Sequence, residues 1–464
     1  MVSLTAITLC DVIHGQWMSG LSDRVLSGGI GTDSRAVVPD MAFFALSGAH
    51  FDGNAYAGDA SRKGAGVVVV SVLPDDIADF CGVILVPDVL VALQTLATWW
   101  RGRLSNLEVV GITGSSGKTS TKDLTLSVLS QAFKLTATRG NLNNHIGVPL
   151  SILRAEPSDQ VAIWEMGMNH AGELAPLCQM VQPRIGLISS IGSAHIEYLG
   201  TRDAIAVEKC TLARSLPADG AMIYPLSCDY AKLIESSTLA RCIGVGIGLG
   251  GEQGVVRAEN LVLDQIGSSF RLVIDGYCDQ QVRLPLHGEH MVSNALLAAA
   301  TGWFLGLTPQ QIVAGLESVN LTVGRLTCEM KDGILVIDDT YNANPESMAA
   351  ALKTLATMEC RGKRWAVLGK MGELGTHARA AHQEVGRLAG EYGINYLIGV
   401  GSDARAITEG ITTSLMNMKI QHFDTKEEAS NYLSDHLDVG DAILFKGSRS
   451  AGMEQLIQLI FNNK

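Results

Sequence analysis

The sequence predicts an α/β fold in three domains, and three observations carry this prediction. Apolar, β-branched runs alternate with helical patterns along most of the chain, which is typical of parallel sheets with crossover helices. The chain has 464 residues, too many for one ordinary core at about 150 residues per domain. A glycine and serine loop directly follows one apolar run, over residues 113–119. We therefore expect a small α/β amino-terminal domain, a central P-loop mononucleotide-binding parallel sheet and a carboxy-terminal, Rossmann-like, doubly wound domain.

The elements follow one another in this order. Domain boundaries are expected near residues 105 and 320, giving segments 1–105, 106–320 and 321–464. Short strands are expected in the first segment at residues 66–72 and 82–86, between loops rich in Gly, Asp and Ser. The strands expected in the central segment after the glycine loop lie at residues 161–166, 185–191, 221–224 and 242–246.

Two later stretches complete the prediction. Residues 256–286 alternate polar and apolar positions around Gly267 and Gly276, which indicates an antiparallel meander before a helix over residues 293–305. Beyond residue 320, strands are expected at residues 334–337, 364–368, 396–400 and 442–445, with helical patterns between them. This second alternation predicts the doubly wound carboxy-terminal domain.

Composition excludes several classes of protein. Hydrophobic residues make up 47% of the chain and charged residues 18%, which describes a well-packed globular enzyme. The net charge of −12 and the lack of a basic run argue against nucleic-acid binding. No stretch approaches about 18 apolar residues and no signal peptide is apparent, so no membrane span is expected. Nine cysteines without CxxC pairs indicate reduced thiols in a cytoplasm. We also expect the protein to be a monomer.

Residues 107–119, LEVVGITGSSGKT, carry the strongest functional signal. An apolar strand leads into a loop whose glycines let backbone N–H groups turn toward an anion. Lys118 supplies positive charge, and Thr119 offers a hydroxyl to Mg²⁺. The residues expected to hold nucleotide phosphates are Thr113, Gly114, Ser115, Ser116, Gly117, Lys118 and Thr119. Ile112 stands where the strict GxxxxGK[ST] pattern has glycine, so this is the shorter GxxGK[ST] form, and an ordinary strand-to-helix turn is the alternative.

Three further side chains are candidates for metal or phosphate chemistry. Glu165 ends an apolar run, where a carboxylate faces the usual ligand crevice of an open α/β sheet, although structural carboxylates are common there. His195 follows the next run, and its alternative is a helix cap or a hydrogen-bonded structural histidine. Lys209 is expected in a helix that starts near Thr201, where a solvated lysine or one paired with Glu208 is the ordinary interpretation.

Residues 338–345, DDTYNANP, place two acids, a phenol and two amides directly after an expected strand. Such polar density at a strand exit suggests a site. A helix cap ahead of Pro345 explains Asn344 but leaves Asp338 and Asp339 unexplained. The strings GKMGELG and KGSR follow two later strands and bring cations and glycines to the same sheet edge, where they can meet phosphates.

Together these strings resemble the Mur ligases of bacterial peptidoglycan synthesis in their order and approximate spacing. The strings are TGSSGKT, EMG, the histidine of IGSAH, the lysine of EKC, DDTYNANP, GKMGELG and KGSRSAGME, and they span all three expected domains. DDTYNANP, GNLNNHIGVP at residues 140–149 and GTDSR at residues 31–35 are most similar to members that join D-alanyl-D-alanine to UDP-N-acetylmuramoyl-tripeptide. The P-loop alone would be weak evidence, whereas the ordered set is specific.

This resemblance implies an ATP-dependent amide ligase whose three α/β domains close around the substrates. ATP would phosphorylate the terminal carboxylate of the tripeptide, and the amine of D-alanyl-D-alanine would then displace phosphate from the acyl phosphate. The product would be the UDP-muramyl-pentapeptide precursor of peptidoglycan, with the third stem residue either diaminopimelate or lysine. The resemblance assigns no general base.

The resemblance also implies roles for particular residues. Substrate contacts fall on Ser34 and Arg35, which would meet the uridine diphosphate, and on Asn143 and Asn144. Two Mg²⁺ ions would be held by Thr119, Glu165, His195 and a carbamylated Lys209. Asn294 is the expected adenine partner, and Arg325, Asp339, Tyr341 and Asn342 would complete the nucleotide site on closure. The catalytic residues implied are Lys118, Lys209, His195 and Arg325.

Two positions depart from the family pattern, and two other functions share part of it. Met291 directly follows His290 where relatives commonly have asparagine, and His145 stands where relatives often have an acid. Another Mur-type ligase or a folylpolyglutamate synthase would share the P-loop and the acidic, histidine and lysine positions, but not DDTYNANP. A P-loop kinase or nucleotide-dependent switch would use the same loop without making an amide.

Overall fold

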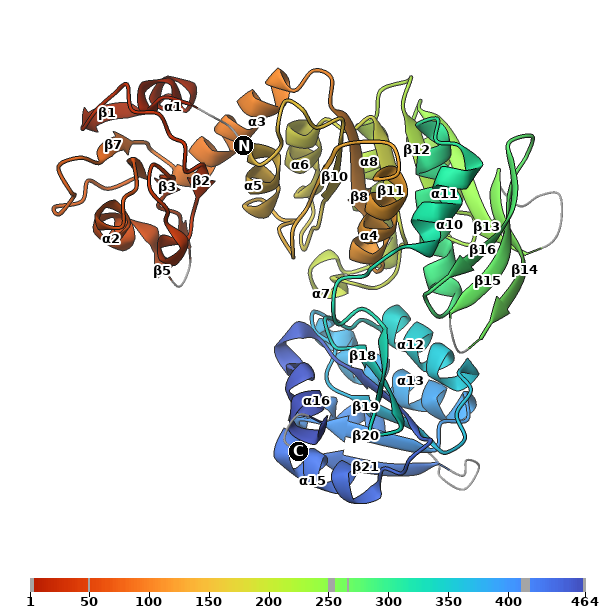
Figure 1. The fold of residues 1–464 in the computed structure, drawn as a ribbon. Coiled ribbons are helices and arrows are strands. Elements are labelled where there is room, and N and C mark those ends of the chain that lie inside the picture. Colours follow the sequence, from red (N-terminus) through yellow and green to blue (C-terminus); the bar gives the residue numbers. More distant parts are fainter. Residues whose placement is uncertain (1–3, 49–50, 249–254, 265–266, 410–417, 462–464) are drawn as a thin grey trace. The chain divides into compact units, whose positions relative to one another are not determined.

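The computed structural model describes residues 4–48, 51–248, 255–264, 267–409 and 418–461 (Figure 1). The chain forms two compact units. Unit 1 comprises Met1–Gly111, Phe133–Met168 and Glu173–Arg184, and unit 2 comprises Ile112–Ala132, Asn169–Gly172 and Ile185–Lys464. Within the described ranges, no helix is long and apolar enough to cross a membrane.

Unit 1 begins with a five-stranded sheet. Its strands, in spatial order, are β1 (Gln16–Ser19), β7 (Gly82–Leu85), β6 (Val67–Val70), β3 (Ala42–Phe44) and β2 (Ile30–Gly31). Strand β1 pairs antiparallel with β7, and the other pairs are parallel. Phe43 and Val68 share an apolar cluster with Ala60, so α2 (Ala57–Arg62) covers this face of the sheet. Strands β6 and β7 confirm the two strands expected in this segment.

A nine-stranded sheet carries the glycine loop. Its strands, in spatial order, are β16 (Cys278–Leu284), β15 (Ser268–Ile274), β14 (Val256–Leu263), β13 (Arg241–Ile247), β12 (Ala221–Pro225), β11 (Ile185–Ile188), β8 (Glu108–Thr113), β10 (Val161–Glu165) and β9 (Leu135–Ala137). The pairs from β11 to β14 are parallel, as is the pair of β10 and β9. Strands β14, β15 and β16 pair antiparallel, which confirms the expected meander.

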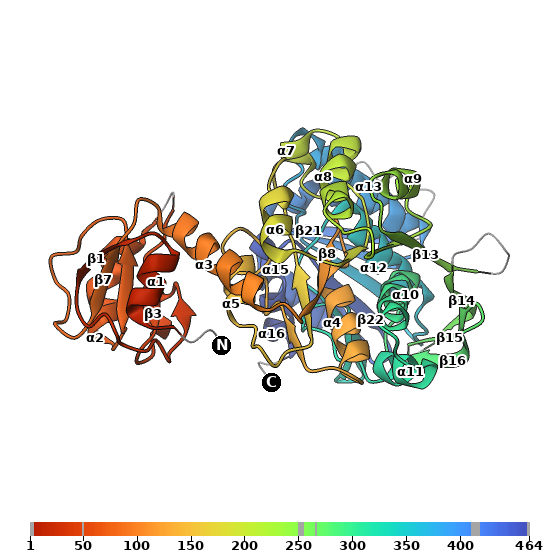
Figure 2. The same ribbon diagram turned by 90° about the horizontal axis from the view of Figure 1, so that it is seen from above.

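Helix α4 (Lys118–Leu129) follows the glycine loop and packs against α10 (Glu289–Phe304), as both views show (Figures 1 and 2). The contact is close because Gly302 lacks a side chain, and a Cβ there would lie 2.8 Å from Val128 Cγ1. Helix α10 begins earlier than residue 293, where the sequence placed its start, because Gly288 caps it with a φ of +95°. The earlier start puts Met291 and Asn294 on one helix.

The carboxy-terminal part of unit 2 is a six-stranded sheet. Its strands, in spatial order, are β17 (Thr327–Lys331), β18 (Ile334–Asp339), β22 (Ala442–Lys446), β19 (Arg364–Leu368), β20 (Tyr396–Val400) and β21 (Lys419–Phe423). Alternate residues of a strand enter different cores: Leu444 packs with α12 (Pro345–Thr357), and Phe445 packs with α15 (Lys426–His436) and α16 (Glu454–Phe461). Helices cover both faces (Figure 1), which confirms the doubly wound domain.

The remaining α-helices and strands include β4 (Ser47–Gly48) and β5 (Phe51–Asp52), which pair antiparallel with each other. In unit 1 the remaining α-helices are α1 (Ala6–Val12), α3 (Val89–Arg103), α5 (Gly147–Leu153) and α6 (Leu174–Val181). In unit 2 they are α7 (Ile196–Leu199), α8 (Arg202–Arg214), α9 (Ala231–Ser236), α11 (Pro309–Glu317), α13 (Ala378–Glu391) and α14 (Arg405–Thr408). Helix α8 confirms the expected helix near Thr201, whose side chain caps it by accepting a hydrogen bond from Ala204 N.

Candidate nucleotide site

The loop between β8 and α4 depends on two glycines. Gly114 has a φ of +156° and Gly117 a φ of +81°, a backbone region that favours glycine. A Cβ on Gly114 would lie 2.0 Å from Ser189 Oγ, and one on Gly117 would lie 3.0 Å from Asn294 Oδ1. Side chains would therefore displace the loop's neighbours. Asn294, the expected adenine partner, lies against the loop.

Two N–H groups of this loop are used within the protein. Ser115 N donates to Ser190 O and Ser116 N donates to Ser190 Oγ, each at 2.9 Å. The first turn of α4 adds further N–H groups and the positive end of the helix dipole, which suit an anion. Lys118 opens this turn, and its Nζ lies 2.6 Å from Gly114 O. Sequence reasoning missed Ser190 because its role depends on a contact with a distant loop.

Arg325 and Tyr341 reach the loop from the carboxy-terminal part of unit 2. Arg325 Nη2 donates to Thr119 Oγ1 at 3.1 Å. The guanidinium carbon of Arg325 lies 4.0 Å from the centroid of the Tyr341 ring, a cation–π contact that restricts the arginine side chain. The structure thus brings together three residues that the sequence had placed in one site.

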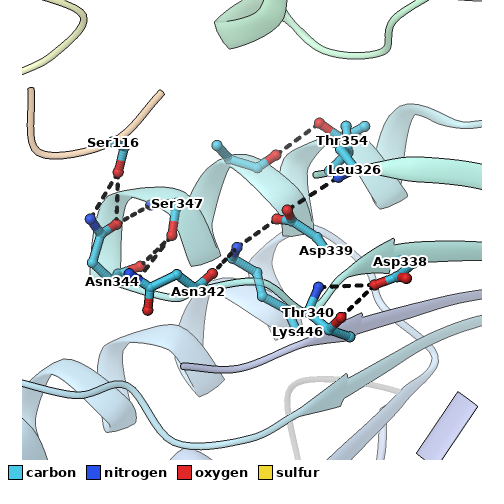
Figure 3. A network of polar contacts seen from close by, with 11 residues as sticks. Ser116, Leu326, Asp338, Asp339, Thr340, Asn342, Asn344, Ser347, Thr354 and Lys446 are labelled. Carbon is cyan, nitrogen blue, oxygen red and sulfur yellow. Dashed lines mark hydrogen bonds and ion pairs between the residues drawn. The ribbon is translucent and has the colours of Figure 1, made fainter. Parts of the chain in front are cut away.

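The junction at the end of β18, over residues 338–345, is a connected polar network (Figure 3). Asp338 Oδ1 accepts from Thr340 N at 3.1 Å and from Thr340 Oγ1 at 2.6 Å. Asp339 Oδ1 accepts from Leu326 N at 3.2 Å, and its Oδ2 pairs with Lys446 Nζ at 2.5 Å. Lys446 Nζ also donates to the Asn342 carbonyl at 2.9 Å. Asp338 and Asp339 therefore both have partners within the protein. These partners explain the two acids, which a helix cap ahead of Pro345 does not.

Asn344 joins this junction to the glycine loop over residues 113–119, which is called the phosphate loop from here on. Its side chain caps α12 by accepting from Ser347 N, as expected for a residue ahead of Pro345. The same side chain donates to Ser116 Oγ at 2.8 Å (Figure 3). It also donates to Ser115 O at 3.2 Å. Sequence reasoning found the cap but missed this contact, because the partners lie 228 residues apart.

The loop after β11 also meets the carboxy-terminal part of unit 2. Glu346, in the first turn of α12, accepts from Ser193 N at 2.7 Å. His195 Nδ1 lies 2.5 Å from Glu373 Oε2, and this hydrogen bond lowers the pKa of Glu373. Because Nδ1 is engaged, Nε2 is the ring nitrogen left for a ligand. Glu346 and Glu373 were not predicted, since a carboxylate on a helix or loop carries no motif of its own.

Lys209 lies inside unit 2 rather than in solvent. The side chain is 1% exposed in α8, so the interpretation as a solvated lysine was wrong. Burial, with the nearby Lys118 charge, holds the pKa of Lys209 well below its usual range. The carboxylate of Glu208 accepts from Gly172 N at 3.0 Å. Lys209 is therefore a buried amine with a weakened hold on its proton.

Glu165 lies in unit 1 as the last residue of β10, fully buried. Its N–H donates to Thr138 Oγ1 at 2.9 Å, and Asn143 Nδ2 lies 3.5 Å from Glu165 Oε2. The structure thus brings together two predicted residues, Glu165 and Asn143. Asn144 has a local role, because its Oδ1 accepts from Gly147 N at 2.9 Å where α5 begins.

Ser34 and Arg35 lie on a short 3₁₀ turn of unit 1. Asp33 caps this turn and pairs with Arg35 Nη2 at 2.8 Å, and the side chain of Arg35 is 87% exposed. Lys63 Nζ donates to Ser34 O at 2.9 Å, which adds a second cation. Exposed ion pairs contribute little to stability, so an incoming diphosphate can compete for this arginine.

Met291 belongs to the apolar core shared by α10 and α12. It is buried with Met348 and Leu352, and its Sδ lies 3.9 Å from Asn294 Nδ2. A polar asparagine at this position would need a partner in that core. The departure from the family pattern therefore has a packing explanation.

A P-loop on an α/β sheet, approached by polar side chains of a doubly wound domain, defines an α/β nucleotide-binding enzyme. The chain belongs to the Mur ligase family, whose models match three parts of it: "Mur ligase family, catalytic domain" over residues 28–88, "Mur ligase middle domain" over 112–302 and "Mur ligase, glutamate ligase domain" over 324–449. Curated relatives named UDP-N-acetylmuramoyl-tripeptide--D-alanyl-D-alanine ligase match almost the whole chain. The relative from Synechocystis is 36% identical over 96% of this chain and 95% of its own length, and that from Escherichia coli 35% over 100% and 99%.

Solved structures agree with these matches. A crystal structure of MurF from Acinetobacter baumannii superposes with a TM-score of 0.90 at 34% identity, covering 100% of both chains. MurF ligase from Thermotoga maritima, solved in complex with ADP, has a TM-score of 0.81 at 26% identity and covers 94% of this chain and 98% of that one.

Proposed function

We propose that this chain is an ATP-dependent, ADP-forming ligase that joins D-alanyl-D-alanine to UDP-N-acetylmuramoyl-tripeptide through an acyl phosphate. The observation that carries the proposal is the double contact between the carboxy-terminal junction and the phosphate loop, Arg325 with Thr119 and Asn344 with Ser116. A ligase needs a second domain over its phosphate loop, because an acyl phosphate hydrolyses unless water is excluded. The relatives whose names state this activity match along almost the entire chain.

The proposed chemistry follows from the low electrophilicity of a carboxylate. An oxygen of the tripeptide carboxylate attacks the terminal phosphorus of ATP, and ADP leaves. The amine of D-alanyl-D-alanine then attacks the acyl carbon, the tetrahedral intermediate expels phosphate, and the nitrogen releases a proton. The pKa of a free α-amine is about 8, so a usable fraction of the amine is neutral at pH 7.

The protein's contribution to phosphoryl transfer is charge placement. Lys118, at the start of α4, adds its ammonium to the helix dipole where a nucleotide phosphate would bind. Arg325, held by Thr119 and the Tyr341 ring, adds a second cation beside the loop. Such fixed charges stabilise negative charge that develops in the transition state. We propose Asp339, Tyr341 and Asn342 as the frame of this nucleotide site and Asn294 as the adenine partner.

Magnesium fits the chemistry of the donors. Within the described ranges, no three or more His, Cys, Asp or Glu side chains group closely enough to hold a metal by themselves. Mg²⁺ commonly uses only one or two carboxylates together with substrate phosphates and water, so the hard oxygens of Thr119 and Glu165 suit an ion bound with ATP. Bound Mg²⁺ would neutralise phosphate charge. We propose that Thr119, Glu165, His195 and Lys209 hold up to two such ions.

We propose that Lys209 carries a carbamate. CO₂ adds only to a neutral amine, and the buried position of Lys209 favours the neutral form. Carbamylation replaces a cation, which would repel Mg²⁺, with an oxygen ligand of the kind that Mg²⁺ prefers.

We propose that unit 1 binds the UDP-linked substrate. Arg35 and the neighbouring Lys63 offer cations to a diphosphate, while Asn143, beside Glu165, offers an amide to the tripeptide. The nine cysteines are free thiols, which fits a reducing cytoplasm. We therefore propose a cytoplasmic reaction that yields the pentapeptide precursor of peptidoglycan.

Phosphate release from ATP tests the proposal directly. Release should require UDP-muramyl-tripeptide and D-alanyl-D-alanine together, and the UDP-linked product should gain the mass of the dipeptide. Running the assay with the diaminopimelate and the lysine tripeptides identifies the third stem residue. Release that ignores the dipeptide would instead indicate a kinase or a nucleotide-dependent switch.

A further inference from the structure

Lys446 is a buried cation at the end of a core strand. It is the last residue of β22, its side chain is 2% exposed, and the preceding Phe445 is fully buried in the apolar core. Its ammonium meets Asp339 Oδ2 at 2.5 Å and the Asn342 carbonyl at 2.9 Å (Figure 3). Lys446 therefore ties the end of β22 to both the beginning and the middle of the polar junction.

Burying the ammonium group of Lys446 costs desolvation free energy, so we expect it to have a role that an apolar residue could not fill. Desolvation lowers the pKa of Lys446, and the neighbouring Asp339 carboxylate opposes that shift. Replacement of a buried ion pair by apolar residues is often neutral or stabilising, so fold stability alone does not account for the pair. The contact that Asp339 makes with Leu326 offers a reason for keeping the Lys446–Asp339 pair.

Asp339 holds a residue in an unfavourable conformation. Its Oδ1 accepts from Leu326 N at 3.2 Å, and Leu326 has a φ of +54°, which is uncommon for a residue with a side chain. Leu326 directly follows Arg325, the residue that reaches Thr119 Oγ1. The direction in which Arg325 leaves the backbone thus depends on the conformation that Asp339 maintains.

We propose that Lys446 is a positioning residue: by fixing Asp339, it holds Leu326 in its left-handed conformation and directs Arg325 at the phosphate loop. The proposal rests on the proposed function only in that Arg325 then acts on ATP. Lys446 pairs with one oxygen of Asp339, and the other oxygen of Asp339 accepts from Leu326 N, so the path from Lys446 to Arg325 runs through Asp339 and Leu326 (Figure 3).

Hydrogen exchange tests the structural half without any substrate. The Leu326 amide should be among the protected amides of the wild-type protein, and Lys446→Met should raise its exchange rate about tenfold or more. Lys363→Met is the matched control, because Lys363 is a half-exposed lysine of the same domain, paired with Asp438 at 3.7 Å. Rapid Leu326 exchange in the wild type, or equal exchange in Lys446→Met, would overturn the proposal. If Lys446→Met does not fold, Lys446→Gln replaces it in the test. Its amide still donates to Asp339, so the Leu326 amide should exchange more slowly than in a variant without that donor.

Kinetics test the functional half. Lys446→Met should lower kcat about tenfold and leave the KM for the UDP-linked substrate within about twofold, because only transition-state positioning is lost. In an Arg325→Ala background the same change should have almost no further effect on kcat, since residues acting through one another are not additive. Multiplying effects would overturn the proposal. A wild-type protein without ligase activity would contradict the proposed function, while the exchange result would still decide the role of Lys446.

Discussion

Lys118 and Lys209 show how burial decides what the same side chain can do. Lys118 opens helix α4 beside the phosphate loop, where a positive charge can meet a phosphate. Lys209 is buried in α8, where burial favours the neutral amine. The first is suited to electrostatic catalysis and the second to covalent modification.

Lys118→Ala should remove most of the ligation activity while the fold is retained. Contacts of this kind contribute roughly 2.7 to 4 kcal/mol or more to the transition state, which corresponds to a loss of about 10²- to 10³-fold in kcat. Steady-state kinetics and thermal unfolding measure the two effects. Lys426→Ala is the matched control, because Lys426 also opens a helix, α15, in another part of unit 2. Near-normal turnover would contradict the assignment of the phosphate loop.

Arg35→Ala should raise the KM for UDP-muramyl-tripeptide and leave the KM for ATP nearly unchanged. The arginine would contribute binding that is equal in the ground and transition states, so kcat should hardly change. Initial rates at varied concentrations of each substrate separate these constants. Arg62→Ala removes another exposed arginine of the same unit, paired with Asp59 and Asp76, and should change neither KM. Equal increases in both KM values for Arg35→Ala would show that the uridine assignment is wrong.

Lys209 should carry a carbamate that acid removes. CO₂ adds to the unprotonated amine, so the carbamate should persist above the lowered pKa of Lys209 and disappear as the pH falls through that value. Carbon-13 NMR with labelled bicarbonate should show one carbamate signal, absent in Lys209→Ala. That variant should be inactive and partly restored by short carboxylates. If Lys209→Ala is active and shows the same carbon-13 carbamate signal as the wild type, Lys209 carries no carbamate.

At the scale of elements, the first turn of α12 has two roles. Asn344 caps the helix and also contacts Ser116 of the phosphate loop, and Glu346 contacts Ser193 after β11. One short segment thus meets two loops that follow neighbouring strands of the central sheet. We expect its removal to affect both stability and nucleotide chemistry.

Asn344→Ala should therefore do more than destabilise α12. Loss of a cap costs about 0.5 to 2 kcal/mol, and Thr425→Ala should cost a similar amount, because Thr425 caps α15 with a capping box of the same kind. Asn344→Ala should also lower kcat, whereas Thr425→Ala should not. Chemical unfolding and ligation assays on both variants give the comparison. Equal kcat values in the two variants would show that Asn344 acts only as a helix cap.

The sequence predicted strands that are apolar and buried better than strands at sheet edges. The core strands β18, β19, β20 and β22 lie where apolar runs placed them. The edge strands β17 and β21 were missed, because TCEMK and KIQHF mix polar and apolar residues and half of such a strand faces solvent. Periodicity detects burial on both faces, and an edge strand lacks it.

At the scale of the whole molecule, nucleotide binding should be linked to folding. ADP at 100 times its dissociation constant should stabilise the protein by about 2.7 kcal/mol, provided that it binds only the folded chain. Thermal unfolding with and without ADP and Mg²⁺ measures this shift. The shift should be much smaller for Lys118→Ala and unchanged for Lys426→Ala. A full shift in Lys118→Ala would place the nucleotide elsewhere.

The sequence by itself determined the α/β class and the family, and it supplied the glycine loop and the residues that we expect at the site. These properties are written in short segments, since periodicity and loop motifs depend on neighbours along the chain. Only the tertiary structure decided that Lys209 is buried, that Asp339 is held by Lys446, and that Asn344 meets Ser116. Those facts depend on contacts between segments more than 100 residues apart or on burial by the whole fold, and no local pattern encodes either.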